Sequence, residues 1–224
     1  MQVVDLGALK TSSIIWRPTA SSWAQTIVCK ATFVLEPDVA SLASEQDYPH
    51  EEANHWDDDP ARSLVSMSEL EPFKARADVL LVGSAFAPGG EPARSVVARM
   101  VVGAVDKSID VHCDRAWSQE GLLQELGHFV KMPLRYERAA ARADTNPVGI
   151  WLGAPPDASG MTVVPNLQPH GFSLTSPADR FDPVGFGPLS PDWPARATKL
   201  GPSGARWERD KPRPPRFEAC AQAS

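Results

Sequence analysis

Alternation between apolar and polar residues is the main structural signal in this chain. The clearest early example covers residues 26–35, where Thr26 and Lys30 occupy polar positions. The alternate positions of this stretch are apolar: Ile27, Cys29, Ala31, Phe33 and Leu35. A repeat of two residues is typical of a strand with one face in the core and the other in water. We therefore predict a half-buried strand here, with the apolar face, Cys29 included, in the core.

Residues 94–113 predict an antiparallel hairpin. Apolar side chains fall on one side of residues 94–105, and a second alternating stretch covers residues 108–113. Asp106-Lys107 lies between the two stretches, so we expect the chain to turn there. In the second stretch Cys113 continues the apolar side, which makes it a core cysteine.

Further elements follow from shorter patterns. Residues 77–86 are an apolar, β-rich run that ends at the turn signal Pro88-Gly89-Gly90, and we expect a central strand covered on both faces. Residues 129–137 alternate again and predict another strand. Residues 139–143 are expected to extend a short helix.

Two regions lack periodicity. Residues 36–72 are acidic and polar, and the part after residue 146 is rich in Gly, Pro and Trp. The second region has too little periodicity for a core of its own. We expect it to wrap around the sheets, pinned by Trp151, Trp193 and Trp207.

Together these patterns predict a mainly β protein. We expect an antiparallel β-sandwich or open barrel with an irregular Pro/Gly/Trp-rich C-terminal wrap and a few short helices. Residues 1–224 would form a single domain, with residues 20–140 as its β-rich core and residues 141–224 as the wrap.

Composition narrows the class of protein. The 224 residues include 22 prolines, about twice average usage, which interrupt helices and disfavour a helical bundle. No apolar run approaches the roughly 18 residues of a membrane span, and the start shows no secretory signal. Three widely spaced cysteines make a poor disulfide framework, so we expect a reducing compartment and no membrane partner.

The charge is unevenly distributed. Residues 36–71 hold eleven acidic residues and one arginine, within a chain of net charge −6. Residues 195–217 are basic, and their bases are the candidate partner-binding residues Arg196, Lys199, Arg206, Arg209, Lys211, Arg213 and Arg216. Regions of opposite sign either dock on each other or face a partner. Nucleic acid is not an expected partner, because the whole chain is acidic and the basic stretch is spaced by prolines.

No catalytic or metal-binding motif is complete. His50 and His55 miss the four-residue spacing of the zinc-protease signature, and the neighbouring run of aspartates cannot converge on one cation. The densest polar cluster, Arg135 to Asn146, offers an acid and arginines to an enzyme. A structural role explains the cluster more simply: Glu137 and Arg138 would pair with neighbouring charges, and Asn146 would bond to the backbone and hold an Asn-Pro turn. We predict no catalytic, cofactor-binding or metal-binding residue.

Several segments form a familiar ordered set. They are residues 28–33, 73–83, 85–90, 114–117, 132–139, 146–149, 164–167 and the tail from Gly185 to Arg196. This order resembles the type VI secretion accessory family known as domain of unknown function 2169. The residues that match its motifs are Lys74, Asp78, Asp114, Arg115, Trp117, Tyr136, Glu137, Arg138, Asn146 and Asn166.

The resemblance implies a cytoplasmic bacterial protein. It further implies a non-catalytic adaptor or chaperone that helps load a secretion effector onto a spike-tip (PAAR/VgrG) protein, with no cofactor. Two alternatives stay open. One is a carbohydrate- or peptide-binding β module that uses solvent-facing Trp151, Trp193 or Trp207. The other is an enzyme that uses the Arg135 to Asn146 cluster.

Overall fold

The computed structural model describes residues 7–19, 21–72 and 77–197 of the chain. Strands dominate, and helical residues form short turns. The strands are β1 (Lys10–Thr19), β2 (Ser22–Lys30), β3 (Phe33–Glu36), β4 (Val39–Leu42), β5 (Asn54–His55), β6 (Leu64–Ser66), β7 (Ser84–Phe86), β8 (Ser95–Val102), β9 (Val105–His112), β10 (Arg115–Trp117), β11 (Leu123–Glu125), β12 (Lys131–Pro133), β13 (Thr162–Val164) and β14 (Leu167–Pro169). The helical turns are η1 (Trp56–Asp58), η2 (Pro88–Gly90), η3 (Tyr136–Arg138) and α1 (Pro194–Ala197).

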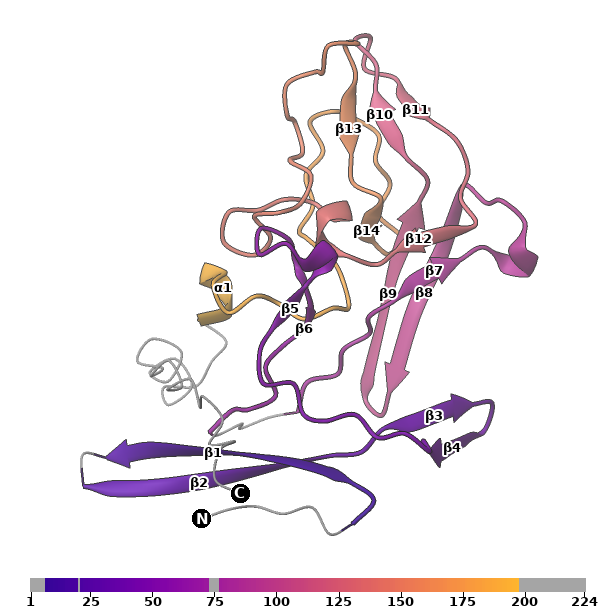
Figure 1. Ribbon diagram of the computed structural model, residues 1–224. Helices are drawn as coiled ribbons and strands as arrows, with labels where there is room; N and C mark the ends of the chain where they lie inside the picture. The colour runs from indigo at the N-terminus through magenta and orange to yellow at the C-terminus, as the bar shows by residue number, and fades with distance from the viewer. Residues whose placement is uncertain (1–6, 20, 73–76, 198–224) are drawn as a thin grey trace.

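The predicted mainly β, antiparallel class is confirmed. The sheets are small: the described strands form two three-stranded sheets, β11-β10-β13 and β14-β9-β8, and four two-stranded ones, with no closed barrel among them. Figure 1 shows β7 to β14 gathered in one body, while the hairpins β1–β2 and β3–β4 lie along one end of it. No helix within the described ranges is long and apolar enough to cross a membrane.

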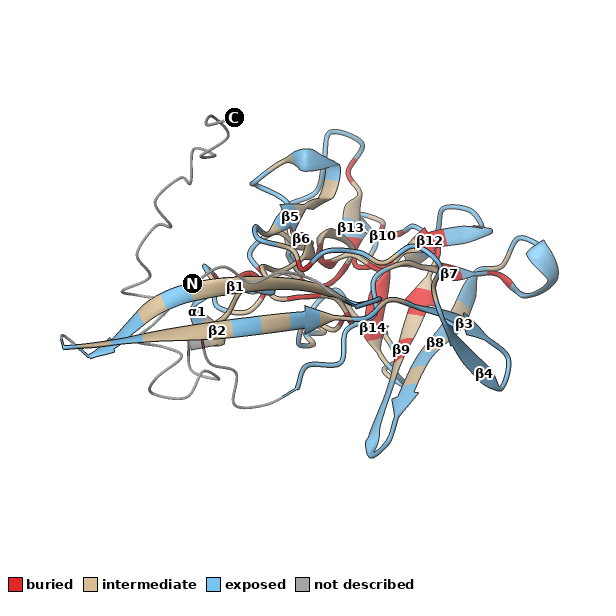
Figure 2. Cartoon of the chain, turned by 60° about the horizontal axis from the view of Figure 1, so that its bottom comes forward, coloured by how far each residue is buried: buried red, intermediate tan, exposed pale blue. Residues whose placement is uncertain are grey.

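The core lies in the body, on one face of the β14-β9-β8 sheet. Ile109 and Val111 of β9 are fully buried, and Leu167 of β14 packs with them. Met132, Leu134 and Tyr136 cover this face, as their alternation predicts, but the strand predicted over residues 129–137 forms only at Lys131–Pro133, and Tyr136 lies in the turn η3. Figure 2 shows that buried residues gather in the body and that both end hairpins are half-buried or exposed.

The β8–β9 hairpin is present, but its turn differs from the prediction. Val102 pairs with Val105, so the chain turns at Gly103-Ala104 and not at Asp106-Lys107. A two-residue hairpin loop needs a positive φ, and Gly103 supplies it with φ 57°. Asp106 instead lies inside β9, where its carboxylate accepts from Arg99 at 2.9 and 2.7 Å.

The burial predicted for residues 26–35 is wrong. The alternation is present, but the stretch divides into β2 and β3, which among the described strands pair only with β1 and β4 respectively. The apolar face is turned outward: Ile27 is 54% exposed, Leu35 is 83% exposed, and Cys29 is exposed as well. The face that carries Thr26 contacts the segment after β6, because Thr26 Oγ1 donates to the Pro72 carbonyl at 2.7 Å.

The predicted central strand over residues 77–86 is also wrong over most of its length. Only Ser84–Phe86 finds a strand partner, β12. Residues 79–82 are exposed, and a backbone bond from Leu81 N to the Phe186 carbonyl ties them to the described part of the wrap. Likewise, residues 139–143 form no helix, because Ala139 and Ala140 bridge to Leu167 and Ile150 instead.

The part after residue 146 is irregular, as predicted, yet it supplies two strands to the body. β13 pairs with β10, and β14 pairs with β9. Trp193 is buried and packs edge-on against Tyr136, with ring centroids 5.3 Å apart. Trp151 is half exposed, so it does not pin the wrap. Trp207 lies outside the described residues.

Candidate protein-binding surface

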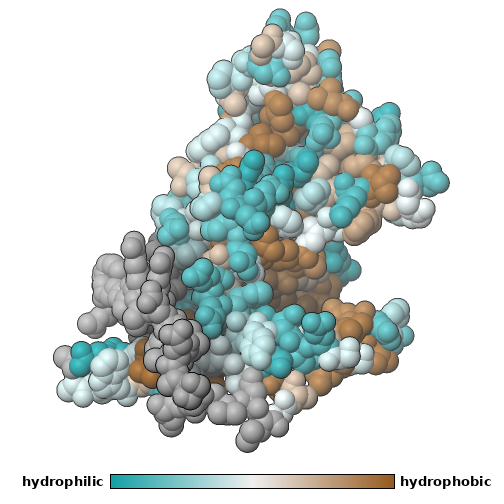
Figure 3. Space-filling model, viewed as in Figure 1, coloured by the Kyte–Doolittle hydropathy of each residue, from teal (hydrophilic) through white to brown (hydrophobic). Residues whose placement is uncertain are grey.

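The hairpin β3–β4 presents an uncovered apolar face. Residues directly opposite in an antiparallel pair share a face, and here Phe33 pairs with Leu42 and Leu35 with Ala40. All four side chains are exposed, Leu35 most of all. We call Phe33, Leu35, Ala40 and Leu42 the β3–β4 apolar face. Figure 3 shows hydrophobic atoms over this hairpin.

The longer hairpin β1–β2 also has exposed apolar side chains on one face. Its outer face carries Ile15, Trp23 and Ile27, each more than half exposed. The Arg17 guanidinium covers one face of the Trp23 indole at 4.5 Å. The opposite face is mixed: it carries Ile14, Trp16 and Val28 beside Thr26 and Lys30, and it contacts the segment that follows β6. There Lys30 Nζ donates to Glu69 at 2.8 Å.

Acidic side chains lie at the turn of the β3–β4 hairpin, and others follow along the acidic region. Glu36 ends β3, and Asp38 occupies the turn with a positive φ of 64°. Other exposed carboxylates of the acidic region are Glu45, Glu51, Glu52 and Asp58. Within the described part of the chain, none of these six carboxylates forms an ion pair. Negative charge therefore lies at the turn end of the apolar face, and we call Glu36, Asp38 and Glu45, which closely follows β4 in sequence, the acidic surround of the hairpin.

The basic candidates of the C-terminal stretch fall almost entirely outside the described residues. Arg196 alone is described, and its Nη1 donates to the Leu189 carbonyl at 2.5 Å and lies 3.5 Å from Met67 Sδ. Its guanidinium is thus engaged within the chain. Lys199, Arg206, Arg209, Lys211, Arg213 and Arg216 lie beyond residue 197, and their role as partner-binding residues remains a prediction.

Three of the residues matched by resemblance form one hydrogen-bonded group. Arg138 Nη1 donates to Asn166 Oδ1 at 3.0 Å and to Asp114 Oδ1 at 3.3 Å. Asn166 Nδ2 donates to the same Asp114 oxygen at 2.9 Å and to the His112 carbonyl at 3.2 Å. The group ties the loop before β14 to the end of β9. This is the structural pairing that the sequence favours for Arg138.

Glu137 and Arg135 hold the acidic region against the body. The Glu137 carboxylate accepts from Ser63 N at 2.6 Å and from Ser63 Oγ at 2.8 Å, and Ser63 is fully buried. Arg135 Nη1 lies 3.0 Å from Asp57 Oδ2. The sequence suggested that Glu137 pairs with a neighbouring charge. The structure shows instead that it bonds to a serine. Each contact joins two residues that lie more than seventy positions apart in the sequence.

Asn146 braces the backbone, as the sequence predicts for an Asn-Pro turn. Its Nδ2 donates to the carbonyls of Tyr136 at 2.9 Å and Ala140 at 2.8 Å. Gly149 leaves room for this amide, because a Cβ there would lie 2.4 Å from Asn146 Nδ2. Burial raises the pKa of Tyr136 to about 12, and its hydroxyl donates to the Gly187 carbonyl at 3.2 Å.

The remaining matched residues do not converge on a common point. Arg115 is buried in β10, where its Nη2 donates to the Pro165 carbonyl at 3.2 Å and to Gln168. Burial lowers the pKa of this guanidinium. Trp117 is buried on the same strand, whereas Asp78 is exposed. Lys74 lies outside the described residues.

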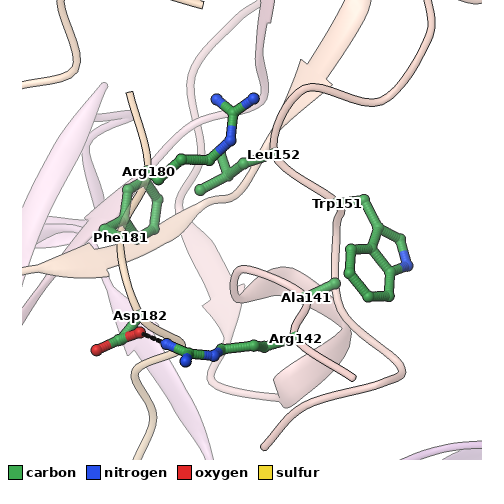
Figure 4. Close-up of a pocket in the computed structure, with 7 residues that line it drawn as sticks. All are labelled: Ala141, Arg142, Trp151, Leu152, Arg180, Phe181 and Asp182. Atoms are coloured by element: carbon green, nitrogen blue, oxygen red, sulfur yellow. Dashed lines mark hydrogen bonds and ion pairs between the residues drawn. The ribbon is translucent and has the colours of Figure 1, made fainter. Parts of the chain in front are cut away.

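An open hollow of about 440 Å³ lies elsewhere, between three segments of the wrap. Its lining residues are Ala141, Arg142, Trp151, Leu152, Arg180, Phe181 and Asp182. Figure 4 shows Arg142 paired with Asp182 and the Arg180 guanidinium turned away from that pair. Glu137, Arg138 and Asn146 do not line this hollow.

At the end of β9, burial shifts the pKa of a thiol and of an imidazole in the directions that favour their uncharged forms. Cys113 is buried as predicted, and its burial raises the pKa of the thiol. Burial, reinforced by the Arg115 charge, lowers the pKa of His112 to about 4. Elsewhere, His55 Nδ1 bonds to the Arg62 carbonyl. Within the described ranges, no group of three His, Cys, Asp or Glu side chains could hold a metal ion.

The exposed apolar residues were missed at the sequence level. Residues 26–35 and 79–82 read as buried strands, because alternation and apolar runs do not say which faces are covered. The pair Pro37-Asp38 carried a usable signal, since proline followed by a residue that tolerates positive φ favours a tight turn. It would have placed β4 opposite β3.

Comparison with known proteins yields one family. No curated protein and no solved structure matches the chain. The family model for an uncharacterized protein conserved in bacteria (DUF2169) matches residues 22–220, which is most of the chain. The matched span includes β2 to β14, the exposed β3–β4 hairpin and the bonded group around Arg138 and Asn166. The chain therefore belongs to the bacterial DUF2169 family.

Proposed function

We propose that this protein is a non-catalytic adaptor or chaperone that binds another protein through its uncovered apolar hairpins. One observation carries the proposal. The apolar face of β2 and β3, whose pattern is that of a buried face, is turned outward, and Leu35 is 83% exposed. Contiguous exposed apolar surface of this kind marks interaction sites in folded proteins.

The energetics of the hairpin support a covering partner. Two-stranded hairpins are marginal in water on their own, and they gain stability from a third strand or from packing on an apolar face. Fully burying a leucine or phenylalanine side chain contributes about 1.5–3 kcal/mol. Phe33, Leu35 and Leu42 would each contribute part of this on binding.

Secretion cargo is the proposed class of partner. The family resemblance implies an adaptor that helps load a type VI secretion effector onto a spike-tip (PAAR/VgrG) protein in the bacterial cytoplasm. Membership of a bacterial family is compatible with this role. The exposed apolar face supplies the kind of surface that a client or a spike-tip protein would cover.

The rival functions receive less support. The Glu137 carboxylate bonds to Ser63, Arg138 Nη1 to Asp114 and Asn166, and Asn146 Nδ2 to backbone carbonyls, while Arg138 Nε and Asn146 Oδ1 are buried without a partner among the described residues. An enzyme would need those groups free and convergent on a substrate. A carbohydrate- or peptide-binding groove would need several solvent-facing tryptophans. Of the three candidates, Trp193 is buried, Trp151 is exposed and Trp207 lies outside the described residues.

A pull-down tests the proposal. The tagged full chain, a Phe33→Ser/Leu35→Ser variant and a Val34→Ser control are used to capture proteins from the native bacterial lysate. Val34 lies on the opposite face of β3 and is 47% exposed, so the control removes exposed apolar area, less than the double variant does, from the other side of the hairpin. We expect a stoichiometric effector or spike-tip protein with the wild type and Val34→Ser, and its loss with the double variant.

Two results would contradict the proposal. One is capture of the same proteins by all three chains, which would place binding elsewhere. The other is recovery of each chain alone at low salt. Circular dichroism and thermal unfolding of each variant separate loss of binding from loss of fold.

A further inference from the structure

We infer that the β3–β4 hairpin binds an extended, basic segment of its partner, which adds as a third strand beside the hairpin. The inference rests on the proposed function and specifies its binding mode. Three features of the hairpin combine to support it: unpaired strand edges, an apolar face, and an acidic surround.

The edges of the hairpin are open. Among the described strands, β3 pairs only with β4, over the register from Phe33–Leu42 to Glu36–Val39. Each strand therefore has a second side with no strand beside it. An exposed edge next to apolar side chains is a template for another strand, whose main-chain bonds supply affinity.

The apolar face sets the pattern of the incoming segment. Phe33, Leu35, Ala40 and Leu42 cover one side of the hairpin, while Val34, Glu36, Val39 and Ser41 occupy the other. A strand added in register continues both sides, because side chains alternate between the faces of a sheet. Its apolar residues at every second position would extend the face that Leu35 now exposes.

The acidic surround selects the charge of that segment. Glu36 and Asp38 stand at the hairpin end, and Glu45 follows β4 closely in sequence. Their carboxylates form no ion pair within the described ranges, so lysines or arginines at the polar positions of the partner strand would neutralise them. Like charge disfavours the same site for anionic lipid or nucleic acid.

Two other occupants fit the site less well. A second copy of this chain would bring Glu36 and Asp38 against the same acidic surround, and opposed like charges are destabilising. The chain's own basic stretch from Lys199 to Arg216 has suitable charge. However, Pro212, Pro214 and Pro215 remove amide donors that a ladder requires.

The test uses the full chain and three labelled synthetic peptides. The first alternates valine with lysine, the second has the same composition with its valines adjacent, and the third alternates valine with glutamate. Fluorescence anisotropy gives the dissociation constant of each. We expect the alternating lysine peptide to bind at least about tenfold more tightly than the other two, because pattern and charge must both match.

Variants then locate the site. Leu35→Ser should weaken binding of the alternating lysine peptide about tenfold or more, because it removes a leucine that binding would bury. Val34→Ser, on the other face, should change it less than about threefold. Glu36→Gln/Asp38→Asn leaves the apolar face intact and should flatten the salt dependence of binding.

The outcomes separate this inference from the proposed function. Equal binding of the alternating and rearranged lysine peptides would overturn strand addition, and equal binding of lysine and glutamate peptides would overturn charge selection. Both results come from the wild type, so they stand even if Leu35→Ser fails to fold. A dimer in solution that Leu35→Ser dissociates would assign the face to a second copy. If the peptides fail but the pull-down still depends on Phe33 and Leu35, the adaptor function stands and only its mode changes.

Discussion

Strand β9 in the body and strands β2 and β3 in the hairpins carry the same alternating pattern but differ completely in burial. Ile109 and Val111 are fully buried, whereas Ile27 is 54% and Leu35 83% exposed. The difference lies in what surrounds them. β9 has a strand on each side and a layer of side chains from residues 132–136 over its apolar face. β3 has one neighbouring strand, and no described segment covers its apolar face.

Periodicity alone does not distinguish two properties of a strand: which side chains share a face, and whether that face is covered. Alternation determines which side chains share a face, because successive residues of a strand point to opposite sides. Coverage of a face depends on segments far away in sequence, or on another molecule. An uncovered apolar face in a folded chain therefore suggests an intermolecular contact more strongly than an exposed apolar residue alone.

The largest expected effect comes from replacing a leucine by alanine in the body and comparing it with the same replacement in the hairpin. Leu167→Ala in the body should lower the free energy of unfolding by about 2–5 kcal/mol, because Leu167 is fully buried and its loss leaves a cavity. Leu35→Ala should change it by less than about 0.5 kcal/mol. Urea unfolding of both variants measures the contrast. Similar losses in the two variants would mean that the β3–β4 apolar face is covered in the isolated chain.

Much of the body was predictable from the sequence. Cys113 is buried because it continues the face of Ile109 and Val111, and Asn146 braces a turn before a proline as such residues do. The position of the β8–β9 turn was missed because a pattern of apolar residues says little about which two residues form the loop. The φ of 57° at Gly103 decides that, and glycine adopts it without strain.

The candidate site was less predictable, for a physical reason. Leu81 and Leu35 belong to segments that look buried in isolation, and their exposure depends on the absence of a covering layer among the described residues. The bond from Ser63 to Glu137 joins residues separated by 74 positions, which no local pattern encodes. The resemblance identified Glu137 as a motif residue, and the structure supplied its partner.

An intermediate effect is expected from pH, and it belongs to the body. Burial and then Arg115 lower the pKa of His112 from 6.5 to about 4, against smaller opposite contributions from Asp110 and Glu125. The unfolded chain then binds a proton more readily than the folded chain between these values. Stability should therefore fall as the pH drops from about 6.5 towards 4, by about 1–2 kcal/mol after discounting for the partly exposed ring.

Urea unfolding at several pH values across that window, for the wild type and His112→Gln, tests this prediction. Glutamine keeps a polar side chain on the same strand face but does not titrate, so its stability should depend less steeply on pH. Parallel curves for the two proteins would assign the pH dependence to other groups.

The smallest expected effect concerns the polar contact that holds the β1–β2 hairpin to the rest of the chain. Burial alone would raise the pKa of Glu69, but hydrogen bonds from Lys30 Nζ at 2.8 Å and from His50 N at 2.7 Å outweigh it and lower the pKa. A lowered carboxyl pKa stabilises the fold above its ordinary value of 4.5, and this contribution is lost as the pH falls below it. Because both side chains are partly exposed, Glu69→Gln should cost less than about 1 kcal/mol of global stability.

Its local effect should be larger than its global one. Backbone hydrogen exchange in β1 and β2 should accelerate in Glu69→Gln, while exchange in β9 stays unchanged, because the hairpin has few buried contacts to slow its opening. Asp106→Asn is the matched control, since it removes an exposed partner of Arg99 in the body. Unchanged exchange in β1 and β2 would show that Glu69 does not anchor the hairpin. Faster exchange confined to β1 and β2 would show that this hairpin opens separately from the body, as expected of a hairpin that a partner covers only on binding.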